Sequence, residues 1–147
     1  MKEPEDHALG RSRGGFGTKI HLVCDRNGKP LGAVLSPGQS HESRLFEAAM
    51  EIACPNDVSP AALAGDKAYS SKAIRAWLAH RNIQDVVPTR DDEIRNENFD
   101  RDLYRRRNVI ERCIGWLKEN RRIATRFEKL AVHYMAMIDI AMILRLL

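Results

Sequence analysis

Two short apolar segments joined by a turn constrain the fold of this chain most. Residues 19–24 and 31–35 have the composition of β-strands, and the intervening DRNGKP supplies an Asn-Gly pair, which readily adopts the positive φ angles of a tight turn. The segment therefore predicts an antiparallel β-hairpin. Residues 1–17 are polar and glycine-rich, and we interpret them as a flexible basic lead-in to a domain spanning residues 18–147.

Strands and helices alternate after the hairpin. The pattern predicts a helix at 42–53, a strand at 61–64, a helix ending near 80, a strand at 85–88, an acidic loop at 89–99, and helices at about 100–126 and 131–147. This order predicts an α/β fold with a mixed sheet and flanking helices. The last segment is apolar almost all round but contains Asp139 and Arg145, so we expect a buried helix or a dimer contact, with no membrane span.

The composition is that of one globular domain. The chain has 147 residues, 44% hydrophobic and 30% charged, which is enough for a hydrophobic core. Its N-terminal sequence MKEPEDHALG has no apolar stretch of the kind found in signal peptides, so we expect a cytoplasmic protein. The three cysteines and five histidines are scattered without metal-binding spacing.

Positive charge is concentrated near the C-terminus. Residues 100–129 contain ten Lys or Arg against five Asp or Glu, a net charge of +5, whereas the whole chain carries +4. Clustered cations suit a polyanionic partner because they neutralise neighbouring phosphates. The distribution predicts nucleic-acid binding but does not distinguish DNA from RNA.

Four polar residues of this basic segment share one side of the predicted helix. Tyr104, Arg107, Glu111 and Lys118 fall within a sector of about 60° at 100° per residue. A carboxylate beside two cations and a phenol is suited to holding a metal ion next to a phosphate, as in nucleases. The alternative is that Arg107 and Glu111 form an ordinary i,i+4 surface pair on a solvated helix face.

A second carboxylate, Asp66, follows the short strand at 61–64. Ligands gather at the carboxyl ends of strands in open α/β sheets, so this aspartate is placed to bind a metal or substrate. The alternative is a turn residue preceding a helix. Together, Asp66 and Glu111 could supply hard oxygen ligands to Mg²⁺ or Mn²⁺, with Arg107 and Lys118 contacting phosphate and Tyr104 contacting the DNA backbone.

Three ordered blocks resemble the catalytic part of DDE-type insertion-sequence transposases that carry a Y-R-E-K signature. These blocks are GRSRGGFGTKIHLVCDRNGKPLGAVLSPGQSHES, AGDKAYSS and YRRRNVIERCIGWLKENRRIATRFEKLA. The similarity covers roughly residues 8–147. The resemblance implies a ribonuclease-H-like fold and a metal-dependent transposase that cuts transposon ends and joins them to target DNA.

The same resemblance assigns roles to individual residues. Asp66 would be the second catalytic carboxylate and Glu111 the third, with Tyr104, Arg107 and Lys118 as the accompanying signature residues. The implied cofactor is Mg²⁺ or Mn²⁺, in a two-metal site expected only in the complete enzyme. The implied partners are transposon ends and target DNA, with a second copy or the upstream part of the transposase as protein partners.

The first carboxylate of the family pattern is missing from the expected position. In such proteins it lies on a central strand upstream of the glycine-rich segment, whereas here that stretch is MKEPEDHAL, and neither Asp6 nor the turn residue Asp25 matches the motif. We therefore expect a C-terminal fragment that lacks its first strand. It could be the second frame of a frameshifted transposase, a remnant of a decayed element or a mis-split gene.

Two other functions stay open from the sequence. The first is a non-catalytic DNA-binding or regulatory module derived from a transposase, which would keep the basic surface without metal affinity. The second is a different metal-dependent nuclease of ribonuclease-H type.

Overall fold

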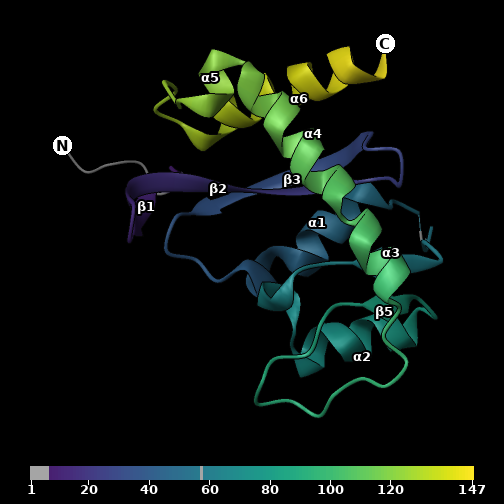
Figure 1. The fold of residues 1–147 in the computed structure, drawn as a ribbon. Coiled ribbons are helices and arrows are strands. Elements are labelled where there is room, and N and C mark those ends of the chain that lie inside the picture. The colour runs from purple at the N-terminus through teal and green to yellow at the C-terminus, as the bar shows by residue number, and fades with distance from the viewer. Residues whose placement is uncertain (1–6, 57) are drawn as a thin grey trace.

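The computed structural model describes residues 7–56 and 58–147 (Figure 1). Its strands are β1 (Gly10–Ser12), β2 (Gly15–Cys24), β3 (Pro30–Pro37), β4 (Ala62–Ala64) and β5 (Gln84–Val86). Its α-helices are α1 (Phe46–Ala53), α2 (Lys72–His80), α3 (Arg101–Arg106), α4 (Asn108–Glu119), α5 (Arg121–Ala124) and α6 (Ala131–Leu146). Two 3₁₀ helices, η1 (Glu42–Leu45) and η2 (Lys67–Tyr69), precede α1 and α2.

The predicted hairpin is confirmed. β2 and β3 pair antiparallel from Thr18 opposite Pro37 to Cys24 opposite Pro30. The turn is held by Asp25, whose Oδ1 accepts hydrogen bonds from the backbone N–H groups of Asn27 at 2.8 Å and Lys29 at 2.9 Å. Gly28 takes a φ of 79°, the positive angle that the Asn-Gly pair predicts for this turn.

The segment predicted as a lead-in differs from expectation where it is described. Gly10–Ser12 forms β1 and pairs antiparallel with Gly15–Gly17, so β2 begins before the predicted strand. The chain reverses there because Gly15 adopts a φ of 108°, which residues with a side chain rarely take. Gly15 therefore allows the tight turn between β1 and β2. Asp6 lies outside the described residues.

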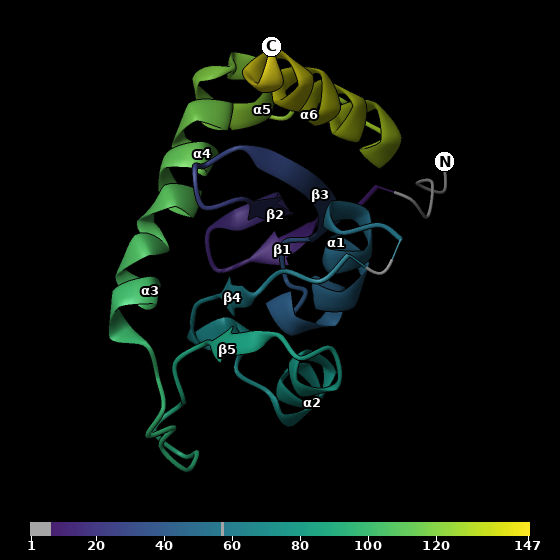
Figure 2. The same cartoon turned by 90° about the vertical axis from the view of Figure 1, so that its right-hand side faces the viewer.

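The strands form two small sheets instead of one. β1, β2 and β3 make an antiparallel sheet, and β4 and β5 make a parallel pair. Figure 2 shows β3, β2, β1, β4 and β5 one below another, with α3 and α4 along one side and α1 and α2 along the other. The arrangement is a mixed α/β architecture in which helices flank both faces of the strand layer.

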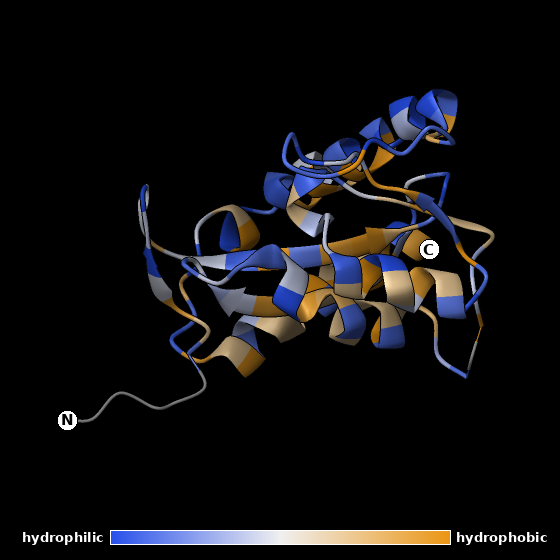
Figure 3. Ribbon diagram, turned by 90° about the horizontal axis from the view of Figure 1, so that it is seen from below, coloured by the Kyte–Doolittle hydropathy of each residue, from blue (hydrophilic) through white to orange (hydrophobic). Residues whose placement is uncertain are grey.

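The hydrophobic core is likewise in two parts. One cluster joins β3, α4, α5 and α6 through Ala33, Leu117, Ile123, Tyr134, Ile138 and Ala141. The other joins α1 and α2 through Phe46, Met50, Ile74, Leu78 and Ile83. Figure 3 shows apolar segments of the helices turned toward the strands. The second cluster also packs against Val23 of β2 and Leu63 of β4, so it spans both sheets.

The two C-terminal helices differ from their predicted form. The helix expected over about 100–126 ends at Glu119, because Asn120 takes an extended conformation (φ −74°, ψ 110°) before the short α5. α6 buries Tyr134, Ile138 and Ala141 on one side only, while Ile140 and Ile143 are exposed. The predicted buried helix therefore packs against β3 with one side and exposes the other, and the alternative of a dimer contact stays a prediction.

None of the helices in the described part of the chain combines the length and the apolar character needed to cross a membrane.

Candidate active site

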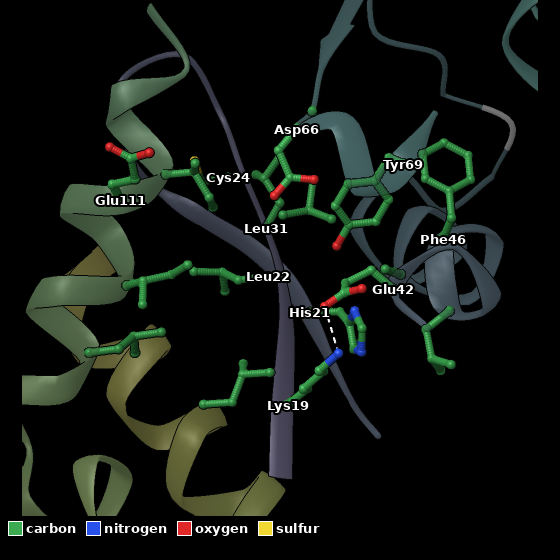
Figure 4. A pocket seen from close by; sticks show the side chains of 18 of the residues that line it. Lys19, His21, Leu22, Cys24, Leu31, Glu42, Phe46, Asp66, Tyr69 and Glu111 are labelled. Carbon is green, nitrogen blue, oxygen red and sulfur yellow. Dashed lines mark hydrogen bonds and ion pairs between the residues drawn. The ribbon is translucent and has the colours of Figure 1, made fainter. Parts of the chain in front are cut away.

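A large cavity lies between β2 and β4 and is walled by α1 and α4 (Figure 4). Its volume is about 1540 Å³. Four of the five predicted site residues line it: Asp66, Arg107, Glu111 and Lys118. The fifth, Tyr104, belongs to α3 and is absent from this lining. Asp66 and Glu111, which are 45 positions apart in the sequence, thus line one cavity.

Asp66 lies directly after β4 and begins η2. Its backbone is extended (φ −82°, ψ 176°), and its Oδ1 accepts a hydrogen bond from Ala68 N at 2.9 Å. The aspartate is therefore the helix cap that the alternative interpretation described. The cap occupies one lone pair of an exposed carboxylate, so acceptor capacity remains for a metal ion or a substrate.

Glu111 lies in the first turn of α4 and pairs with Arg107. Arg107 Nη2 donates a hydrogen bond to Glu111 Oε1 at 2.8 Å. The arginine side chain is 24% exposed and the glutamate 58%, so the carboxylate lies nearer solvent. The predicted i,i+4 pair exists, and it lies at the wall of the cavity.

Tyr104 supports Arg107 from the helix side. The guanidinium of Arg107 lies 5.5 Å from the centre of the Tyr104 ring, within the range of a cation–π interaction. Tyr104 in turn contacts Phe99, with ring centres 5.3 Å apart. The Nε of Arg107 is buried without a hydrogen-bond partner in the described structure. Stacking on Tyr104 thus positions Arg107, whose Nη2 donates its hydrogen bond to Glu111.

The two carboxylates come from different walls of the cavity. Asp66 approaches from the end of β4 and Glu111 from α4, as Figure 4 shows. Within residues 7–56 and 58–147, no three His, Cys, Asp or Glu side chains gather closely enough to hold a metal ion. The donor set of Asp66 and Glu111 is hard and anionic, which is the chemistry that Mg²⁺ and Mn²⁺ prefer. Asp25, Glu42 and Glu128 also line the cavity, but among the described residues they do not gather with these two into a cluster that could hold a metal ion.

The opposite wall carries polar residues that the sequence did not single out as a site. On β2, Lys19 Nζ lies 2.6 Å from Glu42 Oε1, and this hydrogen bond holds the pKa of Glu42 below its ordinary value. Beside it, the buried His21 Nε2 lies 2.7 Å from Ser36 Oγ. Strand alternation in TKIHL places Lys19 and His21 on one face, which is the signal that could have found them.

Burial lowers the pKa of His21 below its ordinary value of 6.5. The unfolded chain then binds more protons than the folded one as the pH falls, so the stability held with neutral His21 is lost below a pH of about 6.5. We expect the free energy of unfolding, measured by urea at several pH values between about 5 and 7.5, to fall toward pH 5. His21→Gln should flatten this dependence, whereas replacing the exposed His133 by glutamine should leave it unchanged.

Cations line the same cavity as the two carboxylates. The lining includes Arg106 of α3, Arg107 between α3 and α4, and Lys118 of α4, with Arg126 and Lys129 after α5. Phosphate groups are bound by such clusters through charge-assisted hydrogen bonds. The cavity therefore combines acidic groups suited to a metal with basic groups suited to a phosphate backbone.

Comparisons with known proteins identify the family of this chain. The family model described as "Transposase DDE domain" matches residues 3–146. A Burkholderia cepacia protein named as the transposase of insertion sequence element IS402 is 30% identical over 122 residues, which cover 78% of this chain and 56% of that protein. A Brucella ovis protein named as the transposase of insertion sequence element IS6501 is 30% identical over 126 residues, covering 84% and 93%.

The mixed α/β fold is consistent with a transposase DDE domain. The chain belongs to the DDE transposase family of insertion sequences. It spans little more than half the length of the Burkholderia relative. No solved structure matches it.

Proposed function

We propose that this chain is the C-terminal catalytic part of a DDE transposase that acts on the ends of transposon DNA. The observation that carries the proposal is the arrival of Asp66 and Glu111, from separate elements, at one cavity that Arg107 and Lys118 also line. A bound Mg²⁺ or Mn²⁺ would activate the attacking oxygen and stabilise the leaving one in phosphoryl transfer. The proposed partners are transposon ends and target DNA.

In this proposal the side chains have distinct roles. Asp66 and Glu111 bind the metal through carboxylate oxygens. Arg107 offers a forked contact to a phosphate and Lys118 a point charge. Tyr104 holds Arg107 by stacking and presents its hydroxyl toward the DNA backbone.

We further propose a ribonuclease-H-like arrangement whose first strand, with the first catalytic aspartate, is not supplied by the described residues. Support comes from the division of the strands into two sheets and from the cavity between β2 and β4. A strand there would join the sheets and bring a third carboxylate to the other two. The upstream part of a transposase is the proposed protein partner, and association through the exposed side of α6 in a homodimer is the second.

Calorimetric titration of Mn²⁺ tests the metal role. Binding by two exposed carboxylates, one of them paired with Arg107, should be weak, about millimolar, and Asp66→Ala should abolish its heat. Asp92→Ala is the matched control, because Asp92 is exposed in the acidic loop and does not line the cavity. Equal heats for the wild-type protein and Asp66→Ala would refute the metal role.

A second candidate function is a non-catalytic DNA-binding or regulatory module. The ion pair between Arg107 and Glu111 favours it, because a carboxylate neutralised by an arginine can serve helix stability alone. This function predicts binding to duplex DNA with no Asp66-dependent Mn²⁺ heat. The same calorimetric experiment, combined with a DNA titration, therefore separates the two candidates.

A further inference from the structure

The hairpin between β1 and β2 is packed at its base against the loop that follows β3. A Cβ on Gly10 would come within 1.6 Å of Gln39 Oε1, so only glycine allows this approach. On the other strand, Gly17 O accepts a hydrogen bond from Gly38 N at 2.9 Å. In Figure 1 the hairpin forms the left-hand end of the strand layer. These contacts hold the base of the hairpin and so position its tip.

One face of the hairpin tip carries an aromatic ring beside a cation. Arg11 is paired opposite Phe16, so the two side chains project from the same face. Gly10 lies on the other face, the one that meets Gln39. The Phe16 side chain is 75% exposed, and Arg11 and Arg13 are exposed as well. The face with the ring is therefore turned to solvent.

Phe16 continues the apolar face of β2 beyond the part that the helices cover. By strand alternation it shares this face with Ile20 and Leu22, which pack against the core cluster of α4, α5 and α6. Between them, Thr18 Oγ1 accepts a hydrogen bond from Arg126 Nη1. Within the described residues, none of the aromatic or cation–π contacts involves Phe16. The ring thus offers an open face to a partner.

The surroundings of this ring are basic. Residues 8–18 contain two arginines and no Asp or Glu, and residues 121–129 contain four Lys or Arg against one Glu. The two segments are adjacent, because Arg126 contacts Thr18. None of the ion pairs in the described part of the chain includes either arginine of the hairpin. An exposed ring among cations suits single-stranded nucleic acid, since bases stack on the ring and phosphates pair with the cations.

We propose that the tip of the β1–β2 hairpin binds an unpaired base of a DNA strand, with Phe16 stacked on the base and Arg11 and Arg13 contacting the flanking phosphates. Bases inside a duplex are stacked on their neighbours, so the ring finds a free base face only where the strand is single. Phe16 also lines the cavity that Asp66 and Glu111 line, so a strand held there lies at the mouth of the same cavity. The identity of the partner as DNA rests on the proposed function.

Binding to DNA with different overhangs is the first test. The probes are a labelled blunt duplex, the same duplex with an overhang of four thymidines, and the same duplex with four abasic nucleotides instead. Each is titrated by fluorescence anisotropy in EDTA. The wild-type protein should bind the thymidine overhang about tenfold more tightly than the abasic one, because only thymidines offer a base to stack on. Equal affinity for the two overhangs, or for the thymidine overhang and the blunt duplex, would refute stacking on an unpaired base.

Substitutions of Phe16 are the second test. Phe16→Leu should remove the preference for thymidines, whereas Phe16→Trp should keep it, because leucine is apolar but has no ring. Phe127→Leu is the matched control, since Phe127 is 60% exposed in a basic segment but does not belong to the hairpin. This control should retain the preference. Equal losses for the two leucine variants, or a preference that survives Phe16→Leu, would overturn the assignment to the hairpin.

The arginines of the hairpin are tested through the salt dependence of binding. Arg11→Gln, Arg13→Gln should weaken binding to the thymidine and abasic overhangs alike and reduce the salt slope by about 1 for each arginine. The preference for thymidines over abasic nucleotides should remain, because the ring is still present. An unchanged salt slope would refute the phosphate contacts.

The same titrations separate this proposal from the proposed function. They contain no divalent metal, so their outcome does not depend on a metal site. A preference for thymidines without Asp66-dependent Mn²⁺ heat would keep the base-binding hairpin and refute the metal site. Asp66-dependent Mn²⁺ heat without that preference would do the reverse. Absence of binding to all three DNA probes would refute both the hairpin proposal and a function in acting on DNA.

Discussion

Ile138→Ala should lower the free energy of unfolding by about 3 kcal/mol, measured by urea denaturation. Ile138 is completely buried at the centre of α6, where it contacts the core cluster that joins α4, α5 and β3. Removing its outer carbons leaves a cavity that the surrounding helices fill only in part. For a chain of this length the loss corresponds to a fall in melting temperature of about 6–12 °C.

Ile143→Ala is the matched control for this prediction. Ile143 lies on the same helix but is 56% exposed, so the identical truncation should change the free energy of unfolding by less than about 0.5 kcal/mol. Similar losses for both variants would mean that α6 is covered on both sides in solution. That outcome would contradict the one-sided packing described for α6.

The double variant Arg107→Gln, Lys118→Gln should weaken binding to duplex DNA by about tenfold or more at low salt. Both side chains line the cavity, and each phosphate contact removed should reduce the salt slope by about 1. Fluorescence anisotropy of a labelled duplex at several salt concentrations measures both quantities. A thermal melt shows whether the fold survives the loss of the Arg107–Glu111 pair.

Removing two other arginines of the same basic segment tests whether position matters. Arg105 and Arg112 are exposed and do not line the cavity, so Arg105→Gln, Arg112→Gln removes the same charge elsewhere. We expect a smaller loss of affinity for this variant. Equal losses for the two pairs would indicate binding by overall charge and would refute a DNA site at the cavity.

Local chemistry made parts of this fold predictable. The hairpin follows from the Asn-Gly turn and the carboxylate of Asp25, and α2 begins where Ser71 Oγ accepts a hydrogen bond from Ile74 N. The spacing of Arg107 and Glu111 also predicts their contact, because residues four apart on a helix are neighbours. Each of these features depends on residues close together in the sequence.

Features that depend on distant contacts were not predictable in the same way. The end of α4 at Asn120 and the exposed side of α6 depend on which helix surfaces pack against other elements. The apolar pattern of the sequence does not predict that packing. The acidic loop is held by Glu93, which accepts a hydrogen bond from Ser70 Oγ and pairs with Arg75. Separations of 18 residues to Arg75 and 23 residues to Ser70 hide these contacts from sequence patterns.

The sequence predicted which residues meet at one cavity only in part, and their roles stay predictions. Asp66 and Glu111 do reach one cavity, as the motifs indicated, whereas Tyr104 stacks on Arg107 and does not line it. The sequence pattern predicted strands but not which strands pair with one another. It therefore did not predict the division into two sheets.

A double-mutant cycle with Mn²⁺ tests the central claim, that Asp66 and Glu111 share one metal site. Calorimetric titrations would compare the wild-type protein, Asp66→Asn, Glu111→Gln and the double variant. If the carboxylates act together, either single change removes the binding heat and the double variant loses nothing further. Independent, additive losses, or heat that survives both changes, would contradict a shared site.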